Sequence, residues 1–155
     1  MRLVLFTLAG VQYGVSADAV VEIVRAVAIT PLAGAPAVVE GLIDVRGLIV
    51  PVFDLRKRLG LQTRPVDPAD HFILVRANQR TAALHVERMG ELVDVDERDT
   101  TESRSQVPSN EHIAGVATLP DGMAFIHDVA TFLSSAESDT LGAAMDARLT
   151  NRAPA

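Results

Sequence analysis

Four histidines are the side chains best suited to chemistry in this chain of 155 residues. They are His71, His85, His112 and His127. None has the spacing of H-E-x-x-H or of another metal-binding motif, and the sequence contains no cysteine for a zinc site, a disulfide or a thiol nucleophile. His71 and His85 fall within strand-like runs, where a packed histidine is the common explanation. The sequence therefore predicts no bound metal ion.

The acidic and hydroxyl side chains also lack a catalytic arrangement. The acids are scattered, and no two of them share an apolar setting that would separate their pKa values. No serine occupies a G-x-S-x-G turn, and there is no Walker loop or G-x-G-x-x-G fingerprint. We expect no enzymatic activity and no cofactor. A small-barrel enzyme or ligand-binding protein that uses one of the histidines remains the alternative.

The charge balance and the apolar runs limit the partners. The net charge is −6 at pH 7, which argues against nucleic acid as a ligand, including a role as an oligonucleotide-binding barrel. The uncharged stretch of residues 26–39 contains two prolines and is shorter than the roughly 20 residues that span a bilayer, so direct membrane insertion is not expected. The apolar run Leu3–Val11 follows Arg2 as in a signal peptide, but Gln12-Tyr13-Gly14 favours a first β-strand in a cytoplasmic protein.

Short strands dominate the pattern along the chain. Leu3–Leu8 is apolar on both faces, which predicts a strand buried on both sides, and Gln12–Val15 can return as its hairpin partner. Arg46-Gly47 separates two further strands as a turn. The other expected strands are Leu42–Val45, Leu48–Phe53, His71–Arg76, Thr81–Val86, Gly90–Val95, Ile113–Leu119 and Met123–Ile126.

Helices are expected to be few and short. Ser16 is a good N-cap, and it precedes apolar residues at helical spacing, which predicts a helix of about two and a half turns with Glu22 on its polar side. These apolar residues are Val20, Ile23, Val24 and Val27. Asp54 and Asp128 can cap two shorter helices. Asp96–Glu111 is charged and predicts a loop.

These elements predict an all-β class with a few short helices. About ten short strands with frequent turns are typical of small, closed or nearly closed barrels, and two lobes that share one hydrophobic seam suit this length. We expect one domain over residues 1–135. Residues 136–155 are rich in alanine, serine and aspartate, and predict a flexible or partly helical C-terminal tail.

One block of the sequence carries a family resemblance. The spacing of glycine, Arg-Gly, proline and Asp-Leu within Gly41–Arg56 resembles the CheW family of bacterial chemotaxis coupling proteins, and weaker agreement extends over about Leu3 to Leu133. The resemblance implies two packed SH3-like, five-stranded β-barrel lobes. It also implies a non-enzymatic adaptor, without a cofactor, that couples chemoreceptors (methyl-accepting chemotaxis proteins) to the histidine kinase CheA.

The implied partners are the regulatory domain of a CheA-type histidine kinase and the cytoplasmic tip of a chemoreceptor. The implied location is the cytoplasm, at receptor arrays on the inner face of the membrane. A diverged CheW-like scaffold for pili, gliding or another output is the alternative within the same family.

The resemblance also marks individual residues. Arg46 matches an arginine associated with receptor binding, and Val20 and Glu22 match positions associated with receptor and kinase contacts. Asp44 stands where asparagine is usual, close to the same edge. Simpler structural roles exist for three of them: Arg46 can bond turn carbonyls, Val20 can pack in the core, and Glu22 can be a solvated charge.

Two glycines of the block are expected to serve the backbone. Gly41 and Gly47 match family glycines, and glycine accepts backbone angles that other residues avoid.

Overall fold

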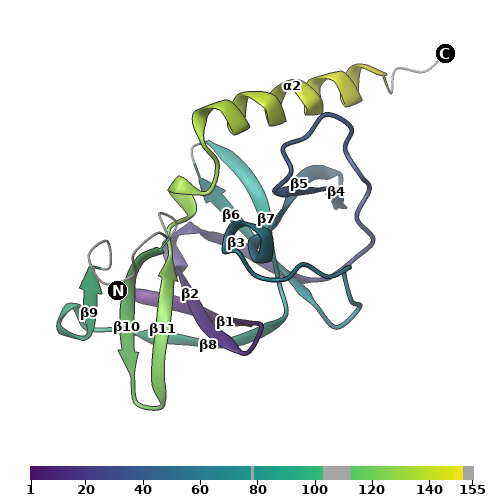
Figure 1. The fold of residues 1–155 in the computed structure, drawn as a ribbon. Helices are drawn as coiled ribbons and strands as arrows, with labels where there is room; N and C mark the ends of the chain where they lie inside the picture. The colour runs from purple at the N-terminus through teal and green to yellow at the C-terminus, as the bar shows by residue number, and fades with distance from the viewer. Residues whose placement is uncertain (78, 103–112, 152–155) are drawn as a thin grey trace.

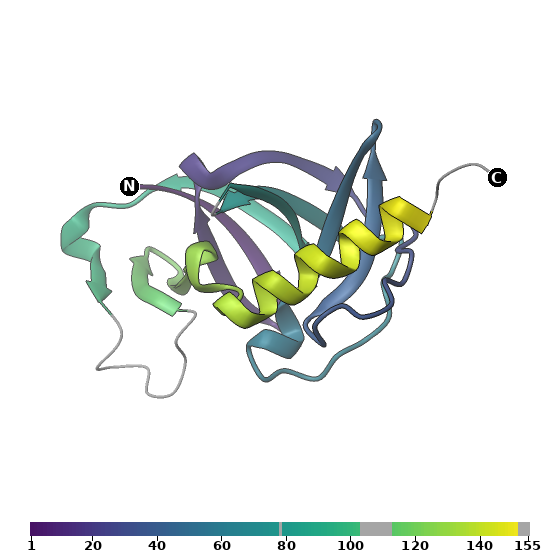
Figure 2. The same cartoon turned by 90° about the horizontal axis from the view of Figure 1, so that it is seen from above.

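The computed structural model describes residues 1–77, 79–102 and 113–151, which form two β-sheets packed on a shared core. A C-terminal helix runs along one side of the pair, as Figures 1 and 2 show from two directions. We call the first sheet with its interior lobe 1 and the second lobe 2. The all-β class with two packed lobes is confirmed.

Lobe 1 is built from strands at both ends of the described chain. In spatial order they are β8 (Arg88–Asp94), β1 (Arg2–Leu8), β2 (Val11–Ser16), β11 (Gly122–His127), β10 (Ile113–Leu119) and β9 (Thr100–Glu102). Strands β2 and β11 pair in parallel, and the other neighbours are antiparallel. The short β9 adds a sixth strand to the five that were expected.

Lobe 2 uses the middle of the chain. Its spatial order is β3 (Val20–Arg25), β6 (His71–Ala77), β7 (Arg80–Val86), β5 (Leu48–Asp54) and β4 (Val39–Val45). Strands β5 and β7 pair in parallel, and the others are antiparallel. The helix α1 (Leu55–Arg58) follows β5, and the carboxylate of Asp54 accepts a hydrogen bond from the backbone N–H of Lys57, as a helix cap does.

The helix expected after Ser16 is wrong. Only a short 3₁₀ turn, η1 (Ala17–Ala19), follows Ser16, and Val20–Arg25 forms the edge strand β3. Half-buried and exposed residues alternate along β3, but its register shifts between Val20 and Glu22, so Val20 pairs with Val75 of the seam and Glu22 pairs with Leu74 of the lobe 2 interior. A run of β-branched residues favours a strand, and pairing with β6 outweighs a helical spacing read from four positions.

The expected loop over Asp96–Glu111 is also partly wrong. Its first residues form a 3₁₀ turn, η2 (Glu97–Asp99), and strand β9. The remainder, from residue 103, lies outside the described residues. The cap expected at Asp128 is present: its carboxylate accepts from the N–H of Ala130 and begins the 3₁₀ turn η3 (Val129–Thr131).

The core has three parts that follow from the two-residue period of the strands. In β1, Val4, Phe6 and Leu8 enter the seam between the lobes, whereas Leu3 and Leu5 point into the interior of lobe 1. All five are at most 9% exposed, as predicted for a strand apolar on both faces. Lobe 2 has a separate interior, formed by Ile43, Val50, Val52, Phe72, Leu74 and Ala83.

The C-terminal segment forms a helix, α2 (Ser135–Asn151). Leu141 is fully buried in the seam, and Arg58 of α1 bonds Glu137 of α2 at 2.6 Å. Ser134 and Glu137 bond each other's backbone N–H groups reciprocally, which is a capping box. The described part of the expected tail is therefore an anchored helix.

Candidate protein-docking surface

The turn between β4 and β5 is set by its backbone. Val45 pairs with Leu48, and the two residues between them have positive φ angles, 52° at Arg46 and 89° at Gly47. Two positive φ angles define the tight hairpin turn in which glycine is favoured. Asp44 Oδ1 accepts a hydrogen bond of 2.7 Å from the N–H of Gly47. The structure therefore uses Asp44 to shape the turn.

The side chain of Arg46 reaches across to the edge strand β3. Its guanidinium donates a hydrogen bond to Glu22 Oε2, and the two side chains are 72% and 31% exposed. The hydrogen bond from Arg46 lowers the pKa of Glu22 below its usual value. The ion pair ties β3 to the β4–β5 hairpin, so two segments that are 24 residues apart in the chain form one patch.

Exposed apolar side chains lie on the same two segments as this ion pair. Val21 and Ile23 on β3 are 59% and 42% exposed, and Leu48 at the start of β5 is 53% exposed. We call the set Val21, Glu22, Ile23, Arg46 and Leu48 the hairpin surface. Exposed apolar residues close to charged ones are typical of protein contact sites.

The predicted site residues divide by position. Glu22 and Arg46 meet on the hairpin surface, and Asp44 lies in its turn. Val20 is half-buried and packs against the seam. The structure therefore gives Val20 a packing contact in the seam rather than a place on the hairpin surface.

Gly41 lies where another part of the backbone comes close. Strand β4 bulges between Val39 and Gly41, and Thr30 forms an isolated bridge with Leu42, through hydrogen bonds of 2.9 and 2.7 Å. A Cβ atom on residue 41 would overlap the carbonyl oxygen of Thr30. Gly41 therefore keeps the incoming segment attached to β4.

An open groove of about 420 Å³ adjoins the hairpin. The lining combines apolar side chains with one acid and one base. It consists of Val27, Ala28, Thr30, Leu42, Ile43, Asp44, Ile49 and Arg148. Because Asp44 both lines the groove and shapes the hairpin turn, the groove runs from that turn to Arg148 in the C-terminal part of α2.

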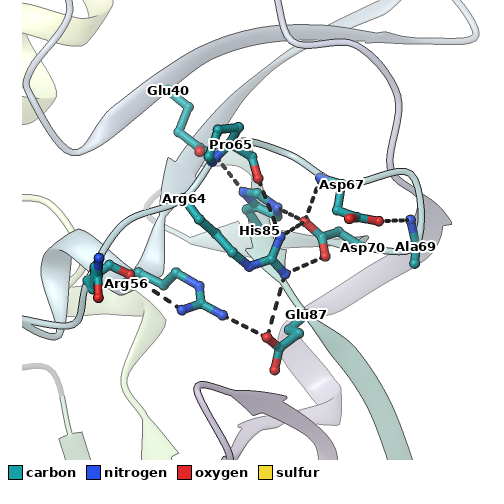
Figure 3. Close-up of polar contacts among 10 residues, drawn as sticks. Glu40, Arg56, Arg64, Pro65, Asp67, Ala69, Asp70, His85 and Glu87 are labelled. Carbon is teal, nitrogen blue, oxygen red and sulfur yellow. Dashed lines mark hydrogen bonds and ion pairs between the residues drawn. The ribbon is translucent and has the colours of Figure 1, made fainter.

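A larger group of charged side chains than the Glu22–Arg46 pair lies elsewhere in lobe 2, and sequence reasoning missed it. Figure 3 shows His85 of β7 between two carboxylates: Nδ1 lies 2.8 Å from Glu40 Oε2, and Nε2 lies 2.7 Å from Asp70 Oδ2. Arg64 bonds both oxygens of Asp70, at 2.7 and 3.2 Å. These residues are far apart in the chain, and no local motif indicates that they meet.

Two further charges extend this cluster. Glu87, in the link from β7 to β8, lies 2.9 Å from Arg56 of α1 and 3.6 Å from Arg64 (Figure 3). We call Glu40, Arg56, Arg64, Asp70, His85 and Glu87 the ionic cluster. It joins α1, β4, β7 and the segment before β6, and its charges are paired with one another.

The other two histidines that the structure describes lie on strands β6 and β11. His127 is buried and its ring stacks on Phe132 at 5.3 Å, His71 is half-buried on β6, and His112 lies outside the described residues. Within the part of the chain that the structure describes, no three metal-ligating side chains gather. No helix among the described residues is long and apolar enough to cross a membrane.

Known proteins are similar to this chain in sequence and in fold. The family model of the CheW-like domain matches residues 2–137. The chemotaxis protein CheW of Treponema pallidum is 28% identical over 147 residues, which are 90% of this chain and 86% of that protein. The CheW of Klebsiella aerogenes is 27% identical over 139 residues, with 86% and 81% coverage.

A solved structure agrees with these relatives. The scaffolding protein CheW from Thermoanaerobacter tengcongensis superposes with a TM-score of 0.80 at 29% identity, covering 88% of this chain and 94% of that one. The relatives are named as chemotaxis or scaffolding proteins and not as enzymes, which agrees with the expected lack of catalysis. With a family match over most of its length and the same two-lobed fold, the chain belongs to the CheW-like domain family.

Proposed function

We propose that this chain is a non-enzymatic chemotaxis adaptor that couples chemoreceptors to the histidine kinase CheA. Its partners are the regulatory domain of CheA and the cytoplasmic tip of a methyl-accepting chemotaxis protein. It works in the cytoplasm, at receptor arrays on the inner face of the membrane. The family membership and the scaffolding role of the solved relative support this proposal.

The hairpin surface is the observation that carries the proposal to particular residues. Val21, Ile23 and Leu48 expose apolar area that a monomer gains nothing by presenting to water, and Arg46 of the adjoining turn is 72% exposed. Arginine and apolar side chains are frequent energetic centres of protein interfaces. We therefore assign docking to this surface.

The test is calorimetry with the CheA regulatory domain and with a receptor tip fragment. Arg46→Ala is expected to weaken binding to at least one partner about tenfold, the scale of an interface hot spot. Its melting temperature should change little, because an exposed ion pair contributes little to stability.

The matched control is Arg2→Ala. Arg2 pairs with Asp94 on lobe 1, at 3.4 Å, with both side chains exposed. Its loss should leave both affinities unchanged. Folded wild-type protein that binds neither partner would contradict the proposed function. Normal binding by a folded Arg46→Ala protein would remove Arg46 from the interface.

A further inference from the structure

Both ring nitrogens of His85 face carboxylate oxygens. A neutral imidazole carries one N–H and one acceptor nitrogen, whereas an ionised carboxylate can only accept. Distances of 2.8 Å to Glu40 and 2.7 Å to Asp70 are hydrogen bonds, so both nitrogens must donate. We propose that His85 is held as an imidazolium that fastens β4 and the segment before β6 onto β7, and that its deprotonation at alkaline pH loosens this corner of lobe 2.

The charges around the ring favour this form. Glu40 faces it from β4, Asp70 from the segment before β6, and Glu87 lies beyond Arg64 in the link to β8. Arg56 and Arg64 supply two positive charges against these three acids. The imidazolium supplies the third, so the ionic cluster is neutral only when His85 is charged.

One further carboxylate lies close: the charge of Asp67 acts on Arg64 and adds to the negative charge that favours the imidazolium. The carboxylate of Asp67 accepts a hydrogen bond from the N–H of Ala69, and the N–H of Asp67 donates to Asp70 Oδ2. On β6, the ring of Phe72 meets the imidazole edge to face at 5.5 Å and carries no charge.

Because His85 and Asp70 are buried, the stability of lobe 2 depends on whether they are charged. His85 is 8% exposed and Asp70 is 2% exposed, so an unpaired charge here would have little water to solvate it. Burial lowers the pKa of His85, but the hydrogen bonds and charges of Glu40 and Asp70 outweigh it, and the net pKa is raised. For Asp70, burial raises the pKa, but bonds from Arg64, the Asp67 N–H and His85 lower it overall, which keeps it a carboxylate.

The direction of the pH effect follows from these shifts. A histidine whose pKa is raised by folding contributes stability that is complete below its unfolded pKa of about 6.5, and that is lost as pH rises through the folded pKa. Loss of the proton leaves one ring nitrogen facing a carboxylate without a hydrogen between them. At acid pH the stability is limited by Asp70, whose contribution to stability is lost as pH falls through its own lowered pKa.

The cluster also lies next to parts of lobe 2 that carry other features. Glu40 is the bulged residue of β4, directly before Gly41, and the far end of β4 enters the hairpin turn. Asp70 accepts a hydrogen bond from the N–H of Ala26, at the end of β3. Release of the imidazolium therefore acts on both strands that frame the hairpin surface.

The first experiment needs only the wild-type protein. Nitrogen-15 NMR of the histidine rings at pH 7 is expected to show both nitrogens of His85 protonated, with the ring titrating above the ordinary pKa of about 6.5. A ring with one unprotonated nitrogen at pH 7, or a titration below that value, would overturn the proposal. The result does not depend on whether the chain binds a receptor or CheA.

The second experiment follows the melting temperature from pH 6 to pH 9.5. Glu40→Gln removes one of the two carboxylates, so the alkaline loss of stability should move to lower pH. His85→Gln should remove the alkaline loss arising from this group. His71→Gln is the matched control, because His71 lies on the neighbouring strand β6 and is half-buried, and it should keep the wild-type profile. An unchanged profile in Glu40→Gln would contradict the proposal, and that test stands even if His85→Gln does not fold.

Discussion

Apart from the sixth strand β9 of lobe 1, the two lobes have the same strand pairing but differ in chain order and in charge. Lobe 1 runs β8-β1-β2-β11-β10 and lobe 2 runs β3-β6-β7-β5-β4, with one parallel pair at the same place in each. Along the chain, lobe 1 forms its first hairpin from β1 and β2, then its edge strand β8, then its second hairpin from β10 and β11. Lobe 2 begins with its edge strand β3. The hairpin β4–β5, which matches the second hairpin of lobe 1, comes next, and the hairpin β6–β7, which matches the first, comes last. The chain order of lobe 2 is therefore a cyclic permutation of that of lobe 1.

The registers make the correspondence residue by residue. Leu3 pairs with Ser16 as Phe72 pairs with His85, so Leu3 corresponds to Phe72 and Ser16 to His85. A bulge precedes Gly115 in β10 as one precedes Gly41 in β4. The caps after the second hairpins agree as well, because Asp128 and Asp54 each begin a short helix.

The comparison shows that the barrel does not require the ionic cluster. The lobe 1 positions that match His85, Glu40 and Asp70 are Ser16, Ala114 and Met1, none of which has a charged side chain. The same strand pairing therefore forms without a buried histidine between carboxylates. In lobe 2 the cluster serves something additional: it fixes the long segment between α1 and β6, which carries Arg64 and Asp70.

The largest expected effects come from the lobe interiors. Phe72→Ala empties the centre of lobe 2 and should cost about 3–5 kcal/mol of unfolding free energy, while Leu5→Ala in lobe 1 should cost about 2–5 kcal/mol. Because both lobes pack on one seam, each variant should shift a single calorimetric transition. Two separate transitions would show that the lobes unfold independently.

A smaller effect is expected where glycines serve the hairpins. Gly41→Ala should lower the free energy of unfolding by about 3 kcal/mol, because the new methyl group displaces Thr30 and its two hydrogen bonds to Leu42. Gly122→Ala on lobe 1 is the comparison, since its φ is also positive but open space surrounds it. Urea denaturation of both variants checks this, and equal losses would show that backbone angle rather than close approach determines the cost.

The smallest expected effect concerns the turn next to the hairpin surface. Asp44→Ala removes the bond to the N–H of Gly47 and should cost about 0.5–1 kcal/mol in urea denaturation. Thr118→Ala, at the matching position of lobe 1, should cost less. Equal costs for the two variants would mean that Asp44 does not hold its turn.

The sequence predicted the fold better than the polar arrangement. Two-sided apolar runs such as Leu3–Leu8 identify strands between two cores, because period two assigns each residue to a face. The helix predicted for residues 20–27 is wrong because a few apolar positions fit the period of a helix as well as that of a strand. Only the pairing with β6 shows that the segment is a strand. The ionic cluster depends on tertiary contacts across 15 and 45 residues, for which no local pattern exists.

The candidate site was less predictable from the sequence than the fold but more predictable than the ionic cluster. The turn at Arg46-Gly47 was predicted from local geometry, whereas the partner of Arg46 required β3 to be a strand at the sheet edge. Once Glu22 is placed on an expected helix, its ion pair with Arg46 cannot be derived. The error in one element therefore concealed the contact that organises the hairpin surface.

The chain order of the strands also has a consequence for synthesis on the ribosome. Strands β3 to β7 follow one another, so lobe 2 can complete every pairing of its sheet once Val86 has emerged. In lobe 1, Tyr13 of β2 pairs with Phe125 of β11, so this pairing cannot form until β11 has been synthesised. Domains generally fold as units while the chain is being made, and distant pairings form slowly. We therefore expect the sheet of lobe 2 to be complete first during synthesis, so that the β1–β2 hairpin packs against it before β10 and β11 are made.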